Sequence, residues 1–182
     1  MEKLKLYMLL LGCKPNGRHT EQHDILFTIG NSLKSVIPDM IAFWPEADGI
    51  IHLDSWREVT RVDNFEIRII LKEEKMIKGK EKIFFLNLGG YKPGEFEEYH
   101  YKVLVVSSEK SLAIQEAKES VFYKHTLSSH IDDKYGVDVD DVYDVEDILP
   151  KHLKEKYAIQ IMPASDRTED DLHIGYLKLS KL

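Results

Sequence analysis

Short apolar runs that end at glycine alternate with polar, turn-rich loops along this chain. Residues 4–12 and 82–89 are two such runs, and their length and terminal glycines predict buried strands. A loop containing proline and glycine follows each run, and a second apolar stretch then begins at His23 and at His100. Because proline and glycine favour turns, each pair of runs predicts two antiparallel strands joined by a long loop.

The two strand pairs are predicted to be copies of one unit. A shift of 77 residues over the segment 5–23 gives seven identities in nineteen positions, where random pairing would give roughly one. The identical pairs are Lys5 and Lys82, Leu9 and Leu86, Leu11 and Leu88, Gly12 and Gly89, Gly17 and Gly94, Glu21 and Glu98, and His23 and His100. Such an internal repeat indicates two tandem modules of the same fold.

The later parts of the copies align with small changes of shift. A shift of 79 aligns a stretch that, in the second copy, has the spacing of an amphipathic helix from Ser108 to Val121. Pro38 interrupts the same stretch in the first copy, which predicts a helix that is kinked or starts late. A shift of 78 then aligns two polar pairs, His52 with His130 and Asp54 with Asp132.

Each copy is expected to end in a hairpin. Asp63-Asn64 is the predicted turn in the first copy, and Asp140-Asp141 is the predicted turn in the second. The order ββα followed by a hairpin predicts an α+β fold, with two tandem modules of β-grasp type, a ubiquitin-like roll. A ferredoxin-like unit is disfavoured, because the loop 13–22 is too short and too rich in turn residues for the helix it would need.

The predicted modules cover residues 1–72 and 82–182, and the charged segment 73–81 is predicted to link them. A chain of 182 residues is long enough for two domains of roughly 90 residues each. The second module is expected to carry an additional helix at 146–156 and further strands at its C-terminal end.

Composition and charge exclude some kinds of partner. With 25 basic and 32 acidic residues, the net charge of −7 disfavours nucleic acid, which needs a basic face. No stretch approaches the roughly 20 apolar residues of a membrane span. The run Leu6–Leu11 is too short for a signal peptide and recurs in mid-chain, so it is predicted to be a strand. The single cysteine, Cys13, fits a cytoplasmic protein without a disulfide framework.

Two motifs of the first copy resemble a known family. They are the loop Leu-Gly-Cys-Lys-Pro-Asn-Gly-Arg-His-Thr-Glu-Gln-His-Asp at Leu11–Asp24, and Phe-Trp-Pro-Glu at Phe43–Glu46 followed by His-Leu-Asp-Ser-Trp-Arg-Glu-Val at His52–Val59. Both resemble a small bacterial family catalogued as domain of unknown function 1543, which occurs as one or two copies per chain. The resemblance covers the first copy throughout and the second more loosely, and it implies no activity because none is assigned to that family.

Polar residues shared by both copies are the candidates for a functional site. They are Glu21, His23, His52 and Asp54, with the counterparts Glu98, His100, His130 and Asp132, and the first copy adds Arg18 and His19. Imidazole and carboxylate groups suit zinc, manganese or iron. Glu21 and His23 would share one face of an extended strand, as would His52 and Asp54. The spacing matches no established metal motif, so the sequence assigns no metal or cofactor.

A structural role is the favoured explanation of these residues, because carboxylates lock turns and histidines bond loop carbonyls. Cys13 is expected to be a small core residue rather than a nucleophile. The Gly12 to Gly17 loop is expected to be a turn rather than a phosphate loop, since Arg18 and His19 stand where lysine and a hydroxyl are required.

The predicted function is therefore that of a non-catalytic binding or interaction module, with an unknown protein or small molecule as its partner. The alternative is a metal-dependent hydrolase in the first copy, with Glu21 as base and His23, His52 and Asp54 as ligands. A sensor that binds a small molecule between the copies is a third hypothesis. The sequence leaves open whether the chain is an enzyme and whether it forms homo-oligomers.

Overall fold

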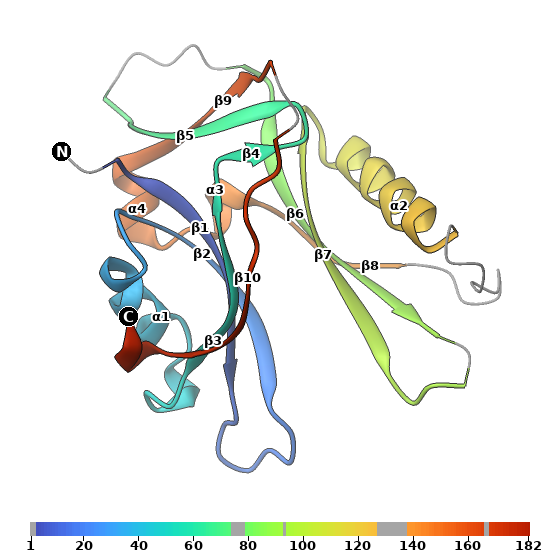
Figure 1. Ribbon diagram of the computed structural model, residues 1–182. Coiled ribbons are helices and arrows are strands. Elements are labelled where there is room, and N and C mark those ends of the chain that lie inside the picture. Colours follow the sequence, from blue (N-terminus) through green and yellow to red (C-terminus); the bar gives the residue numbers. More distant parts are fainter. Residues whose placement is uncertain (1–2, 74–78, 93, 127–137, 166–167) are drawn as a thin grey trace. The chain divides into compact units, whose positions relative to one another are not determined.

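The chain folds into a mixed α+β structure, rich in strands, that divides into two compact units (Figure 1). The computed structural model describes residues 3–73, 79–92, 94–126, 138–165 and 168–182. Met1–Ile77 and Leu149–Leu182 belong to the first unit, and Lys78–Ile148 is the second. This division differs from the expected modules because the C-terminal segment pairs with strands of the first unit.

The main sheet of the first unit has the strand order β10-β3-β1-β2, and every pair in it is antiparallel. Its strands are β1 (Lys5–Cys13), β2 (Gln22–Gly30), β3 (His52–Val59) and β10 (His173–Lys178). The near-continuous apolar run of β1 fits its central place, because no side chain of this strand is exposed on either face.

Helical turns connect β2 to β3. They are the 3-10 turn η1 (Lys34–Val36), the helix α1 (Ile37–Phe43) and the 3-10 turn η2 (Pro45–Ala47). Pro38 lies in the first turn of α1, where its missing N–H leaves no intrahelical bond unmade. The late start predicted for this helix is confirmed.

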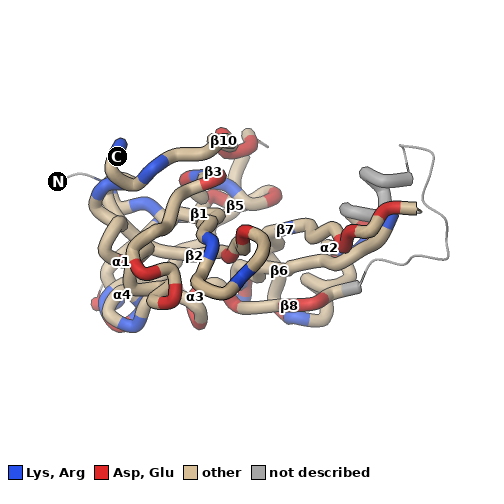
Figure 2. Tube along the Cα trace, turned by 90° about the horizontal axis from the view of Figure 1, so that it is seen from below, with Lys and Arg blue, Asp and Glu red and all other residues tan. Residues whose placement is uncertain are grey.

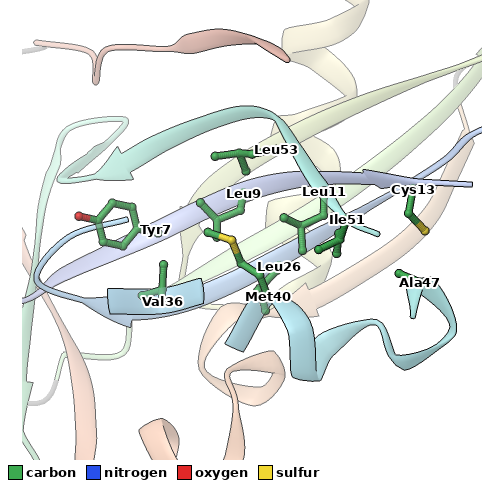
Figure 3. Packing of buried hydrophobic residues seen from close by; sticks show 10 residues of the cluster. All are labelled: Tyr7, Leu9, Leu11, Cys13, Leu26, Val36, Met40, Ala47, Ile51 and Leu53. Carbon is green, nitrogen blue, oxygen red and sulfur yellow. The ribbon is translucent and has the colours of Figure 1, made fainter. Parts of the chain in front are cut away.

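A large buried cluster of the first unit lies on one face of its main sheet. Tyr7, Leu9, Leu11 and Cys13 alternate along β1 and pack with side chains of β2, β3 and the helical turns (Figure 3). Because side chains of a strand alternate between faces, Gly12 belongs to the opposite face.

A second, three-stranded sheet completes the first unit. It has the order β4-β5-β9, with β4 (Arg61–Val62), β5 (Phe65–Leu71) and β9 (Tyr157–Pro163). The hairpin predicted at Asp63-Asn64 is confirmed, and Asp63 takes the left-handed conformation with φ of 51°. The helix α4 (Lys151–Lys156) precedes β9, and the 3-10 turn η3 (Leu179–Lys181) follows β10.

The second unit is built on the sheet β7-β6-β8. Its elements are β6 (Lys82–Tyr91), β7 (Glu98–Ser107), α2 (Lys110–Thr126), β8 (Asp138–Asp144) and α3 (Val145–Ile148). Phe84, Leu86 and Leu88 of β6 pack against Ala113 and Ala117 of α2. The small side chains of α2 let the helix approach the sheet closely.

Three expectations fail in detail. Asp140-Asp141 is not a hairpin turn, because both residues lie inside the continuous strand β8. The helix expected at 146–156 is divided into α3 and α4 before Pro150, which lacks an N–H and restricts the residue preceding it. The β-grasp assignment is not confirmed: all described strand pairs are antiparallel, whereas that roll has a parallel central pair.

Candidate functional site

Gly12 lies at the centre of a polar row across the main sheet of the first unit. It pairs with His23 on β2 and with His52 on β3. Residues directly opposite one another share a face, so the two histidines flank the glycine on the face opposite to the buried cluster. Because glycine has no side chain, neighbouring side chains can lie directly over its Cα atom.

Asp54 enters this row through a β-bulge. Leu10 pairs with Ser55 and Leu11 pairs with Leu53, so Asp54 is the extra residue on β3. A bulge bends its strand and turns a side chain away from the regular alternation. The bulge therefore lets the Asp54 side chain lie over Gly12, beside His52.

The Asp54 carboxylate joins the two histidines. Its Oδ2 atom lies 3.2 Å from Nε2 of His23 and 3.4 Å from Nε2 of His52. This oxygen is buried, and within the described residues no hydrogen bond reaches it. Both imidazole nitrogens thus lie within ion-pair distance of the oxygen without the direction that a hydrogen bond requires.

Gly12 is needed for this packing. A Cβ atom at Gly12 would lie 2.4 Å from Oδ2 of Asp54 and 2.4 Å from Nε2 of His52. Both separations are shorter than any ordinary contact, so any other residue would displace the carboxylate and the ring.

Glu21 reaches the same group from the start of β2. Its Oε1 atom lies 2.7 Å from Nε2 of His52, which is a hydrogen-bond distance. The structure therefore brings Glu21, His23, His52 and Asp54 together as one cluster. The His52 and Asp54 side chains are 12% and 24% exposed, against 43% for His23 and 46% for Glu21. The cluster is thus covered beside β3 and open to solvent beside β2.

Strand β10 provides part of this cover. The ring of Tyr176 lies 4.5 Å from that of His52. His173 stacks on Trp56 with 3.7 Å between ring centroids and 7° between the planes. Sequence reasoning missed His173 and Tyr176, although the alternating pattern of 172–179 did indicate the strand that carries them.

The other first-copy candidates lie apart from the cluster. Arg18 and His19 are exposed in the loop between β1 and β2, and no described contact joins either side chain to Asp54. Cys13 is buried in the core, where burial, followed by the charges of Glu21 and Glu46, raises the pKa of its thiol. A raised pKa disfavours the thiolate, which is the nucleophilic form.

The second unit repeats the row around Gly89. Gly89 pairs with His100 on β7 and with Asp138 on β8. A Cβ atom at Gly89 would lie 2.6 Å from Oδ2 of Asp140. This carboxylate oxygen lies 3.2 Å from Nε2 of His100, the same separation as between Asp54 and His23.

The bulge is also in the same place. Asn87 pairs with Asp141 and Leu88 pairs with Val139, so Asp140 is the extra residue of β8. Glu98 completes this group: one ligand atom each from Glu98, His100 and Asp140 lies within 4.8 Å of the other two.

The strand register gives other counterparts for His52 and Asp54 than the sequence comparison predicted. His130 and Asp132 lie outside the described residues, whereas Asp138 and Asp140 occupy the register positions of His52 and Asp54. A fixed shift fails here because α2 has 17 residues and α1 has seven. The signal that could have found Asp140 is Asp-Val-Asp at 138–140, which resembles His-Leu-Asp at 52–54.

An ion pair supports this corrected alignment. Lys5 Nζ lies 2.6 Å from Oε1 of Glu58 in the first unit, and Lys82 Nζ lies 2.7 Å from Oδ2 of Asp144 in the second. Lys5 and Lys82 differ by the same 77 residues as the strand glycines. Glu58 and Asp144 differ by the same 86 residues as Asp54 and Asp140.

Two separations in the first cluster are those of neighbouring ligands on one ion, whereas no three of its residues have ligand atoms that all lie within 4.8 Å of one another. Four ligands placed tetrahedrally at about 2.1 Å from zinc are about 3.4 Å from one another. The Asp54 oxygen lies at 3.2 and 3.4 Å from its two histidine nitrogens, whereas the 2.7 Å between Glu21 and His52 is that of a hydrogen bond. Two imidazoles and a carboxylate around one point are a donor set for zinc or another late transition metal.

Part of the chain matches a family whose function is not known. Residues 18–69 match the model of the family described as Domain of Unknown Function (DUF1543). The matched segment contains the whole first cluster, and no curated protein matches the chain. No helix in the described ranges is long and apolar enough to cross a membrane.

A solved structure shares the fold. The chain is similar to a protein Il1583 from Idiomarina loihiensis, with a TM-score of 0.61, 20% sequence identity and 95% of each chain covered. At this identity the likeness is one of fold, so the chain has a mixed α+β fold that another protein adopts over nearly the same length.

Proposed function

We propose that this chain is a non-catalytic metal-binding protein, and that its first unit holds one divalent transition-metal ion between His23, His52 and Asp54. The observation that carries the proposal is the buried Oδ2 atom of Asp54. It lies 3.2 and 3.4 Å from two imidazole nitrogens, and no hydrogen bond reaches it within the described residues.

A cation accounts for this oxygen better than a hydrogen-bonded network does. A buried acceptor that is left without a hydrogen bond costs roughly 1–3 kcal/mol. An ion bound between the carboxylate and the two imidazoles would satisfy the oxygen and both nitrogens at once, and it would draw these ligand atoms closer together than they lie in the structure. The glycine makes room for the Asp54 carboxylate and the His52 ring over the sheet, and the bulge places Asp54 there.

Glu21 is the proposed fourth ligand. A histidine nitrogen must be deprotonated to bind a metal, so His52 would give up its 2.7 Å contact with Oε1 of Glu21 and leave that oxygen available. A structural or storage site has four protein ligands, whereas a catalytic zinc keeps one position open. A fourth protein ligand within reach therefore favours a binding protein over the alternative of a hydrolase.

We further propose that the two sheets are tandem copies of one ββαβ unit. The support is the shared strand order, the bulge at equivalent positions and the ion pair repeated from Lys5 to Lys82. This replaces the ββα-hairpin unit expected from the sequence.

A cytoplasmic location and the lack of a nucleic-acid partner remain parts of the proposal. Basic and acidic residues are interspersed along the traces of both units, and the net charge is −7 (Figure 2). A surface that binds phosphate groups needs a concentration of basic residues.

The test is a calorimetric titration of the full chain with Zn²⁺. The wild-type chain is expected to bind Zn²⁺ with release of protons. Asp54→Asn is expected to weaken the tightest site by more than about 100-fold, since even the loss of a residue that only orients a ligand costs about 10- to 100-fold in metal affinity. Asp48→Asn is the matched control, because Asp48 is an exposed carboxylate in a left-handed turn that asparagine tolerates. Equal affinity in wild type and Asp54→Asn, or no binding at all, contradicts the proposal.

A further inference from the structure

We propose a second cation site in the second unit, formed by Glu98, His100 and Asp140, with a stronger preference for Mn²⁺ over Zn²⁺ than the first site has. It rests on residues of the second unit alone. The first site can therefore fail without removing the second.

The ligand atoms of this second site lie closer together than those of the first. One ligand atom each from Glu98, His100 and Asp140 lies within 4.8 Å of the other two, and in the described ranges this is the one such group of three. Nε2 of His100 and Oδ2 of Asp140 are 3.2 Å apart, close to the separation of two ligands on one ion. Gly89 leaves room for the Asp140 carboxylate, as Gly12 does for that of Asp54.

The charge around the second site favours a cation. Two carboxylates meet one imidazole there, and no lysine or arginine of the described residues forms an ion pair with Glu98 or Asp140. The hydroxyl of Tyr91 donates a hydrogen bond to Glu98, which holds that carboxylate in place.

The ligand types set the expected preference. Carboxylate oxygens and water suit Mn²⁺, whereas imidazole suits Zn²⁺. By strand register, Asp138 takes the position that His52 has in the first unit. The His100 and Asp140 side chains are 37% and 35% exposed, so water can complete the larger coordination shell of Mn²⁺.

The experiment uses the full chain with Mn²⁺ as a paramagnetic probe and follows the imidazole protons by NMR. Substoichiometric Mn²⁺ is expected to broaden the His100 signal in wild type and in Asp54→Asn. Asp140→Asn and Glu98→Gln are both expected to abolish the broadening at the same concentration. Glu97→Gln is the matched control, since Glu97 is the exposed neighbour of Glu98.

Two outcomes overturn the inference. One is a His100 signal that Mn²⁺ leaves sharp in the wild-type chain. The other is broadening that persists in both Asp140→Asn and Glu98→Gln, with the amide spectrum showing that each variant is folded. Asp138→His provides a gain-of-function arm: it is expected to raise the Zn²⁺ to Mn²⁺ affinity ratio of this site by about tenfold or more, and an unchanged ratio counts against the assignment.

Discussion

The rows around Gly12 and Gly89 share one backbone arrangement and differ in the residue at one register position. In each, a glycine lies opposite a histidine, and a bulge brings an aspartate over the glycine. The first row has His52 where the second has Asp138. The strand register therefore places the histidine and the aspartate alike in both rows, and the residue at the third register position differs between them.

The two clusters also differ in cover. In the first unit β10 adds a fourth strand beside β3, and His52 is 12% exposed under Tyr176. The described sheet of the second unit has three strands, and His100 is 37% exposed. A covered site holds its ion with protein ligands, whereas an open one exchanges ligands with water.

The largest effect expected from this comparison is on stability. Leu9 and Leu86 are equivalent and fully buried residues of the central strands. Leu9→Ala and Leu86→Ala should each cost about 2–5 kcal/mol of unfolding free energy. Amide hydrogen exchange should locate each loss in its own unit. A loss shared equally by both units after either change would show that they do not unfold separately.

The next effect concerns the glycines. Gly12→Ala should displace Asp54 and His52 and lower stability by about 1–3 kcal/mol, with loss of the tight Zn²⁺ site measured by calorimetry. Gly89→Ala should affect the Mn²⁺ site alone. Gly17→Ala is the control for backbone strain, because Gly17 has φ of 78° and its Cβ would touch nothing within 4 Å. If Gly17→Ala also loses metal binding, the loss in Gly12→Ala cannot be assigned to the displaced Asp54 and His52 side chains.

A smaller effect depends on pH. Burial, followed by the charge of Glu58 and a hydrogen bond to it, raises the pKa of Tyr7 to about 12, and the second unit has Phe84 at this position. The pKa of Tyr7 is higher in the folded state, so its contribution to the free energy of unfolding is complete below pH 10. It is lost by up to about 1.4 kcal/mol per pH unit as pH rises towards 12. Urea unfolding at pH 8 and pH 11 should show a smaller alkaline loss in Tyr7→Phe than in wild type.

The smallest effect is at β10. His173→Ala removes the stack on Trp56 and should cost about 0.5–1.5 kcal/mol. Trp56 fluorescence, measured in a Trp44→Phe background, should report this as an earlier transition for the first unit. If the transition midpoint does not move, the stack contributes nothing to holding β10 in place.

The first strand pairs and the ligand types of the first cluster could be predicted from sequence, because apolar runs, turn residues and the repeat are local signals. Asp140 could not be placed, because a fixed shift between copies fails once α2 is longer than α1. A bulge leaves no mark in the apolar pattern, so the convergence of Asp54 with His23 was not readable either. The strands β9 and β10 were expected, but their pairing with the first unit is a long-range contact that local patterns do not encode.

The measurement that tests the central claim most directly is a Zn²⁺ titration of the wild-type chain, followed through the imidazole signals of His23 and His100. Two equivalent sites of different softness predict that both signals change and that His23 changes at the lower Zn²⁺ concentration. If Zn²⁺ leaves both signals unchanged, the two glycine rows are structural features of the sheets and not metal sites.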